Sequence, residues 1–206
     1  MHKNTISTLI KSLPENVRLI AASKTRAAET VQAAKTLGIQ HFGENYVQEA
    51  EQKAGGITDV TWHLIGALQT NKVSKALQIF DVFHTVDREK LLNKLNSAAM
   101  QAGKTPDVFL QVNIGREPQK AGIFPEDLPL LVGKAQACIA LNLVGLMAIP
   151  PANTPPAPYF AEMQKLAKTY NLHRLSMGMS TDWQEALTYG ATDIRLGTAL
   201  FGARSA

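Results

Sequence analysis

The sequence lacks the features that mark secreted and membrane-embedded proteins. Cys138 is the one cysteine among 206 residues, so an internal disulfide is impossible. The N-terminal residues contain no long apolar segment, and no stretch approaches the roughly 18 apolar residues of a transmembrane helix. We therefore expect a soluble, cytoplasmic protein with no membrane partner.

Charge of one sign is also scarce. Lys and Arg number 21 and Asp and Glu 17, which gives a net charge of +4 without any run of like charges. Nucleic-acid binding would require a clustered basic stripe interleaved with aromatic residues, and the sequence has none. The composition thus predicts no nucleic-acid partner. With 45% hydrophobic residues, a chain of this length is expected to form one domain over residues 1–206.

Short apolar runs alternate with amphipathic segments along the whole chain. The runs predict eight strands, at residues 18–23, 39–42, 61–65, 82–85, 108–113, 144–149, 174–177 and 193–197. Helical spacing of apolar residues predicts helices at residues 27–37, 87–100, 125–137, 158–170 and 182–189. Eight strands that alternate with helices predict an α/β fold, a single-domain (β/α)₈ barrel.

The two ends of the chain favour a closed barrel. Only residues 198–206 follow the eighth strand, too few for a full eighth helix, and residues 5–12 carry apolar Ile6 and Ile10 that could cover the gap. An open doubly wound sheet is the competing fold. Its Gly-x-Gly-x-x-Gly motif would follow the first strand, where this sequence reads Lys24-Thr25-Arg26.

Chemically useful residues follow the strands at the end where barrels of this kind bind their ligands. Lys24 ends the first strand on the same side as small Ala22, and a lysine amine there can form an imine with an aldehyde. The alternative is a lysine that extends from the strand end into solvent. Ser176 ends the seventh strand, and Gly197 and Thr198 end the eighth, where hydroxyls and backbone amides can hold a phosphate.

An arginine completes this pattern. Arg195 lies two residues before Gly197, so it faces the barrel interior. A strand-end lysine, phosphate-binding residues and an interior arginine together indicate pyridoxal 5′-phosphate, held as a Schiff base on Lys24. Asn45 follows the second strand and either lines the cofactor ring or caps a helix.

Three further polar residues invite a functional interpretation. His63 and His84 lie within predicted strands, where a histidine is more often a hydrogen-bonded core residue than a base. No third ligand stands at metal-binding spacing, so we predict no metal site. Glu44 could pair with Lys24 or with another basic group.

Five blocks of sequence carry a family resemblance. They are Ala22-Ser23-Lys24-Thr25, His41-Phe42-Gly43-Glu44-Asn45-Tyr46, Trp62-His63-Leu64-Ile65-Gly66-Ala67-Leu68-Gln69 with Asn71-Lys72, Leu175-Ser176-Met177-Gly178-Met179-Ser180, and Arg195-Leu196-Gly197-Thr198-Ala199-Leu200-Phe201-Gly202. Together they resemble the pyridoxal phosphate homeostasis protein family, relatives of the barrel domain of bacterial alanine racemase. The blocks extend from residue 22 to residue 202, nearly the whole chain.

The resemblance assigns roles to these residues. It implies that Lys24 is the Schiff-base lysine, that Ser176, Gly197 and Thr198 bind the phosphate, and that Arg195 faces the pyridine nitrogen. An arginine cannot accept the proton of that nitrogen, so carbanion chemistry on the ring is weakened. The resemblance therefore implies a non-catalytic protein that acts in vitamin B6 homeostasis and buffers the cofactor or delivers it to apo-enzymes that depend on it. We expect the protein to be a monomer.

Two other functions are compatible with a lysine beside a phosphate site. One is a pyridoxal phosphate-dependent amino-acid racemase, which would need a second base from an additional domain. The other is an aldolase that forms an imine with a phosphorylated sugar, although such enzymes usually carry the lysine on a later strand. The segment from Asn113 to Gly122 departs from the Ser-Gly-Glu-rich stretch frequent in the family, so the resemblance assigns it no role.

Overall fold

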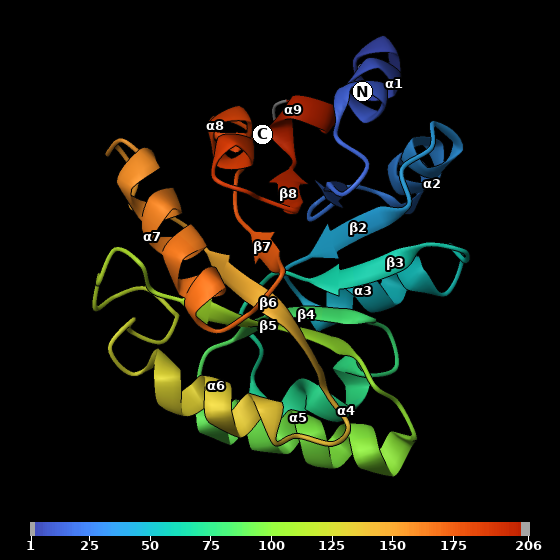
Figure 1. Ribbon diagram of the computed structural model, residues 1–206. Coiled ribbons are helices and arrows are strands. Elements are labelled where there is room, and N and C mark those ends of the chain that lie inside the picture. The colour runs from blue at the N-terminus through green and yellow to red at the C-terminus, as the bar shows by residue number, and fades with distance from the viewer. Residues whose placement is uncertain (1–2, 203–206) are drawn as a thin grey trace.

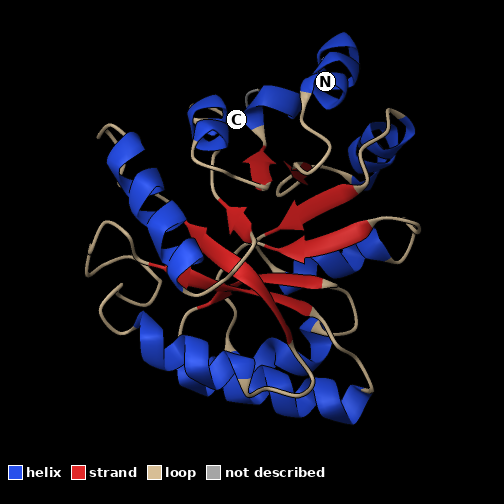
Figure 2. Cartoon of the chain, in the orientation of Figure 1, coloured by secondary structure: helices blue, strands red, loops and turns tan. Residues whose placement is uncertain are grey.

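Eight parallel strands form a closed barrel in chain order, β1-β2-β3-β4-β5-β6-β7-β8, with the helices outside it (Figures 1 and 2). The structure, a computed structural model, describes the backbone of residues 3–202 and the side chains of residues 6–202. The predicted (β/α)₈ barrel is confirmed. Within the described residues, no helix has the length and apolar character needed to cross a membrane.

The strands begin and end close to the predicted positions. Their bounds are β1 Arg18–Ala22, β2 His41–Glu44, β3 Thr61–Leu64, β4 Val82–Val86, β5 Asp107–Val112, β6 Asn142–Ala148, β7 Arg174–Ser176 and β8 Asp193–Leu196. The largest difference is in β2, which begins and ends two residues later than predicted. Gly38 ends the preceding turn with a φ of 97°, and the strand starts only after the chain has left that turn.

The helices lie in the outer ring, with the bounds α1 Lys3–Ser12, α2 Ala28–Thr36, α3 Val47–Ala54, α4 Val73–Ala76, α5 Glu89–Ala102, α6 Leu128–Gln136, α7 Ala157–Thr169, α8 Trp183–Thr188 and α9 Thr198–Phe201, and a 3₁₀ turn η1 at Thr70–Lys72. The apolar pattern did not single out α3 and α4. In α3 the buried positions are Val47, Ala50 and Lys53, so a lysine occupies the inner face and weakens the hydrophobic periodicity. With four residues, α4 is too short to show a period.

The barrel closes between β8 and β1. Arg18 is the register partner of Asp193, and Ala21 is the partner of Leu196. The short helix α9 follows β8, and in Figure 1 α1 occupies the sector of the outer ring between α9 and α2. Ile6 of α1 is fully buried in the main core, as expected for a segment that covers this gap.

The interior of the barrel is unusually polar. A large apolar core lies between the strands and the helices, whereas the interior apolar cluster of buried residues consists of Val82, Phe109 and Met147. The other buried side chains along the strands include His63, His84, Ser176, Asp193 and Arg195. Buried polar groups need hydrogen-bond partners, and most of these side chains find them in one another.

Candidate functional site

Lys24 lies in the turn directly after β1, at the end of the barrel where the strands finish, which we call the mouth. The side chain is half-buried, and Ala22, the last residue of β1, is also half-buried. The neighbouring residue Thr25 has a φ of 64°, a left-handed conformation that a threonine adopts only when its surroundings hold it there.

A buried ion cluster holds this turn on both sides of Lys24. Lys53 donates to Glu44 and Glu49, both at 2.7 Å, and to the Ser23 carbonyl at 2.8 Å. Glu49 in turn accepts a hydrogen bond from the Thr25 amide. The cluster therefore fixes the residues before and after Lys24. Its key member, Lys53, is one that sequence reasoning missed, because a lysine as the seventh residue of a helical segment gives no sign of burial.

Glu44 is the most buried member of the cluster. Its side chain is fully enclosed, and its carboxylate accepts from the Ser23 hydroxyl at 2.6 Å as well as from Lys53. The sequence left open whether Glu44 pairs with Lys24 or with another basic group, and in the structure it pairs with Lys53. Burial raises the pKa of Glu44, while the hydrogen bonds from Lys53 and Ser23 lower it.

The Lys24 turn also contacts the segment after β8, where the predicted phosphate ligands Gly197 and Thr198 lie. Arg26 donates to the Gly202 carbonyl at 2.6 Å, and its guanidinium lies 5.7 Å from the centre of the Phe201 ring. Because β8 pairs with β1, the turn after β8 lies at the same edge of the mouth as Lys24. Lys24 and the predicted phosphate ligands therefore share one side of the barrel.

Gly197 and Thr198 begin α9, as predicted for residues that follow β8. A Cβ built on Gly197 would make ordinary contacts with Ala22, at 3.5 Å from its carbonyl oxygen and 3.6 Å from its Cβ, so the start of α9 lies against the end of β1. The first amides of a helix have no partner within it, and they suit an anion. Ser180 adds a hydroxyl at this point, 3.4 Å from the Ala199 amide. It was noted only as part of a motif, and its contact depends on two loops meeting.

Arg195 lies inside the barrel, as predicted, with 5% of its surface exposed. Its guanidinium donates to the Ser176 hydroxyl and, at 3.0 Å, to the carbonyl of Ala148 at the end of β6. Among residues 6–202 no carboxylate lies within ion-pair distance of it, and burial lowers its pKa to about 10 against the smaller opposing effect of Asp193 and Asp182. A buried cation without a carboxylate partner favours an acceptor group at the mouth.

Ser176 is fully buried and its hydroxyl contacts Arg195 and His84. In this structure, therefore, Ser176 supports the arginine, and its role as a phosphate ligand stays a prediction. Asn45 is half-buried and precedes Tyr46, the N-cap of α3. The interpretation of Asn45 as a helix cap is therefore wrong by one residue, because β2 continues to Glu44. Its place beside the cofactor ring stays a prediction.

His63 and His84 are buried, hydrogen-bonded residues of β3 and β4, as expected. His84 also stacks on Phe109 with ring centres 4.4 Å apart. Half-buried His41 of β2, which the sequence analysis did not consider, contacts His63 at 3.1 Å. No group of histidine, cysteine or carboxylate side chains in the described part of the chain could hold a metal ion.

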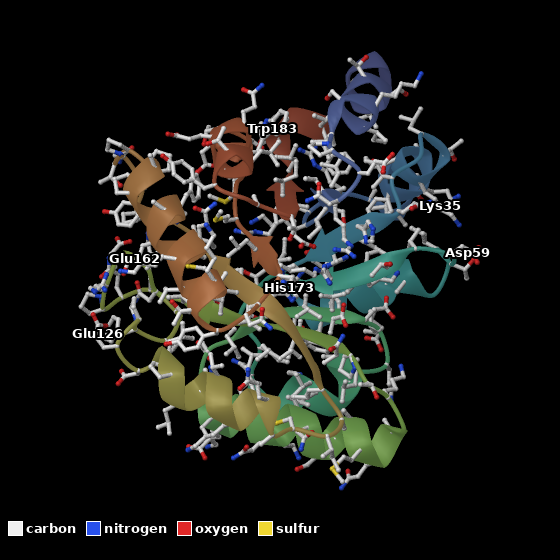
Figure 3. The ribbon with its side chains drawn as sticks, viewed as in Figure 1. Lys35, Asp59, Glu126, Glu162, His173 and Trp183 are labelled. Atoms are coloured by element: carbon white, nitrogen blue, oxygen red, sulfur yellow. The ribbon has the colours of Figure 1, made fainter. Side chains whose placement is uncertain are left out.

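The segment from Asn113 to Gly122, whose sequence departs from the family, is an ordered loop after β5. Arg116 forms ion pairs with Glu126 at 2.7 Å and Glu162 at 3.0 Å, two residues that lie on the same side of the molecule in Figure 3. The loop also lines a hollow of about 310 Å³ together with Gln111 and Ile149. It therefore forms part of the rim of the mouth.

Comparisons with known proteins show the class to which this chain belongs. A family model described as "Alanine racemase, N-terminal domain" matches residues 3–205, so the barrel and its mouth define a protein of that class. An alanine racemase of Clostridium difficile has the same fold at 16% identity, with a TM-score of 0.79 over 98% of this chain and 56% of that one.

More similar proteins identify the family within that class. The pyridoxal phosphate homeostasis protein of Pseudomonas aeruginosa is 44% identical over 199 residues, 93% of this chain and 86% of that protein. PipY of Synechococcus elongatus, in a structure with PLP bound, is 38% identical with a TM-score of 0.91, over 97% of this chain and 99% of that one. The chain belongs to the pyridoxal phosphate homeostasis protein family.

The buried histidines predict that acid weakens the fold. Burial lowers the pKa of His41, His63 and His84 below the usual 6.5, so below that pH the unfolded chain binds protons that the folded protein does not. The free energy of unfolding should then fall as pH decreases, by up to about 1.4 kcal/mol per pH unit for each histidine.

Urea unfolding between about pH 7.5 and 5.5 measures this effect, in a range chosen to limit the opposing contribution of Glu44. His41→Gln should reduce the slope, because it removes one of the histidines whose pKa burial lowers. A free energy of unfolding that is independent of pH over this range would contradict the prediction.

Proposed function

We propose that this protein carries pyridoxal 5′-phosphate as a Schiff base on Lys24 and passes it to apo-enzymes in the cytoplasm. The observation that supports this most is the approach of Gly197, at the start of α9, to Ala22, which precedes half-buried Lys24 by two residues. The Ser180 hydroxyl and the first amides of α9 suit the phosphate. In this proposal Ser176, Gly197 and Thr198 complete the phosphate site, and Asn45 lines the ring.

The chemistry of Arg195 agrees with a carrier, although racemases of related fold work with an arginine at this place. When bound, the cofactor can supply an aldehyde for an imine and a ring that withdraws electrons. An arginine beside the ring nitrogen donates hydrogen bonds and cannot accept a proton, so it leaves the ring a weak electron sink. The names of the relatives, homeostasis proteins, agree with such a role. We propose that residues 1–206 form one domain and act as a monomer with no catalytic residue.

Transfer to a recipient enzyme tests the proposal. The protein loaded with pyridoxal 5′-phosphate is mixed with the apo-form of a dependent aminotransferase, and recovery of aminotransferase activity is followed over time. We expect activation together with loss of the carrier's visible absorption, because an imine on a half-buried lysine can exchange with another amine. Retention of the cofactor in the presence of excess apo-enzyme would contradict the carrier role.

A second assay addresses the racemase alternative. The loaded protein is incubated with L-amino acids, and formation of the D-isomers is measured by chiral chromatography. We expect no sustained turnover. Steady racemisation that disappears in Lys24→Ala would make the protein an enzyme and overturn the proposal.

A further inference from the structure

A row of hydrogen-bonded side chains crosses the barrel interior. The Nδ1 atom of His41 lies 3.1 Å from Nε2 of His63, and Nδ1 of His63 lies 2.9 Å from Nε2 of His84. The Nδ1 atom of His84 lies 2.9 Å from the hydroxyl oxygen of Ser176, which in turn accepts a hydrogen bond from Arg195. We call these five side chains the interior column.

The stagger of the strands makes the column climb from one end of the barrel to the other. His41 is the register partner of Thr61, and His63 is the partner of Val82, so each ring lies two residues further along its strand than the ring before. His41 begins β2 at the N-terminal end, while Arg195 reaches the final carbonyl of β6 at the mouth. The column therefore connects the far end of the barrel to the candidate cofactor site.

Arg195 determines the direction of every hydrogen bond in the column. A guanidinium can only donate, so the Ser176 oxygen accepts from it, and the one hydrogen of that hydroxyl has His84 as its acceptor. A neutral imidazole that accepts at Nδ1 carries its proton on Nε2. His84 then donates from Nε2 to His63, and His63 donates from Nε2 to His41. The reverse direction would bury the Ser176 hydrogen without an acceptor, which is costly.

Neighbouring charges favour the neutral rings that this direction requires. His41 faces Arg18 of β1, Arg174 of β7 and Asp193 of β8, and Arg174 is itself paired with Asp193 and Asp107. Burial and the nearby arginines lower the pKa of His63 and His84 well below the ordinary value. The three imidazoles are therefore neutral at physiological pH.

We propose that His84 is a positioning residue for Arg195, acting through Ser176, and that His63 and His41 fix the tautomer in which it does so. Because His84 takes the hydroxyl hydrogen, Ser176 presents its oxygen lone pairs to the guanidinium. Arg195 is then held at the mouth with donors free for the cofactor ring. The role of Arg195 toward the cofactor rests on the proposed function. The direction of the hydrogen bonds in the column does not.

The direction of the hydrogen bonds in the column can be measured in the protein without any cofactor. Long-range ¹H–¹⁵N spectra distinguish the two neutral tautomers of histidine by the shifts of their ring nitrogens. We expect Nε2–H for His41, His63 and His84, with exposed His173 (labelled in Figure 3) as the internal reference for a solvated ring. An Nδ1–H tautomer at His84 would overturn the assigned direction and with it the proposal.

Two matched variants test the effect on Arg195. His84→Phe keeps an aromatic ring beside Phe109 but removes the acceptor, whereas His84→Asn keeps an acceptor near the position of Nδ1. We expect the Kd for pyridoxal 5′-phosphate to rise about tenfold in His84→Phe, as for the loss of one hydrogen bond, and to recover largely in His84→Asn. The Arg195 Nε–H signal should shift in the first variant and return in the second.

Ser176→Ala keeps the test decisive if His84→Phe fails to fold. It removes the shared hydroxyl, so in the protein without cofactor the Arg195 Nε–H signal should shift as it does in His84→Phe, and adding His84→Asn to it should change nothing further. An unchanged Arg195 Nε–H signal in both Ser176→Ala and His84→Phe would overturn the positioning role. If the parent protein does not bind pyridoxal 5′-phosphate, the proposed function fails, while the tautomer spectra still decide the direction of the column.

Discussion

Replacing Lys24 with alanine is expected to abolish covalent capture of pyridoxal 5′-phosphate while leaving the barrel folded. The amine lies half-buried at the mouth, in a turn held by contacts of its neighbours rather than by its own side chain. Removing it therefore takes away the imine-forming group without breaking the ion cluster. The measurement is the visible absorption of the loaded protein, followed by borohydride reduction and mass analysis of the labelled peptide.

A matched lysine supplies the control for that experiment. Lys120 lies on the loop after β5 and lines a hollow at the same end of the barrel. Lys120→Ala should keep the absorption band and the label on the peptide that contains Lys24. A band that survives in Lys24→Ala, or a label on Lys120 in the parent protein, would show that the imine forms elsewhere.

Replacing Lys53 with methionine should have the largest effect on stability. The side chain of Lys53 is 6% exposed and its partner Glu44 is 0% exposed, so the substitution leaves a carboxylate buried without its counter-ion. Removing one member of a buried pair typically costs about 3–5 kcal/mol, even where the intact pair itself contributes little. Urea unfolding monitored by circular dichroism measures the loss.

A surface ion pair calibrates this result. Lys75 pairs with Glu51 at 2.6 Å, with the two side chains 43% and 52% exposed, and Lys75→Met should lower the free energy of unfolding by less than about 1 kcal/mol. Hydrogen exchange at the Thr25 amide should accelerate only in Lys53→Met, because Lys53 orients its acceptor Glu49. Equal effects of the two substitutions would mean that the cluster does not hold the Lys24 turn.

The parts of the fold that the sequence predicts are those with a local signal. The strands are apolar runs between turn residues, so their order and the closed barrel could be predicted from the sequence. Helix α3 could not, since its inner face carries Lys53 at a position where periodicity would require an apolar residue. The two-residue shift of β2, which ends at Glu44, places the N-cap of α3 at Tyr46, so the alternative interpretation of Asn45 as a helix cap was wrong.

Contacts between distant segments explain what sequence reasoning missed at the site. Lys24, Gly197 and Thr198 could be singled out because each lies within two residues of the end of a strand, and strands that end together bring such residues together. The interior column depends on the stagger between neighbouring strands. The register of β2 against β3 decides whether the ring of His41 lies beside the ring of His63 or beside another residue of β3. Nothing local to a histidine carries that information.

The polar interior has a consequence for how this barrel assembles. Arg195 of β8 needs acceptors on β6 and β7, His84 of β4 needs a donor from β7, and Arg174 of β7 bridges carboxylates on β5 and β8. A partly built barrel would leave several of these groups enclosed but unsatisfied, at a cost that apolar interior layers would not incur. We therefore expect the last strands to join in a single cooperative step, with no stable intermediate that lacks β7 and β8.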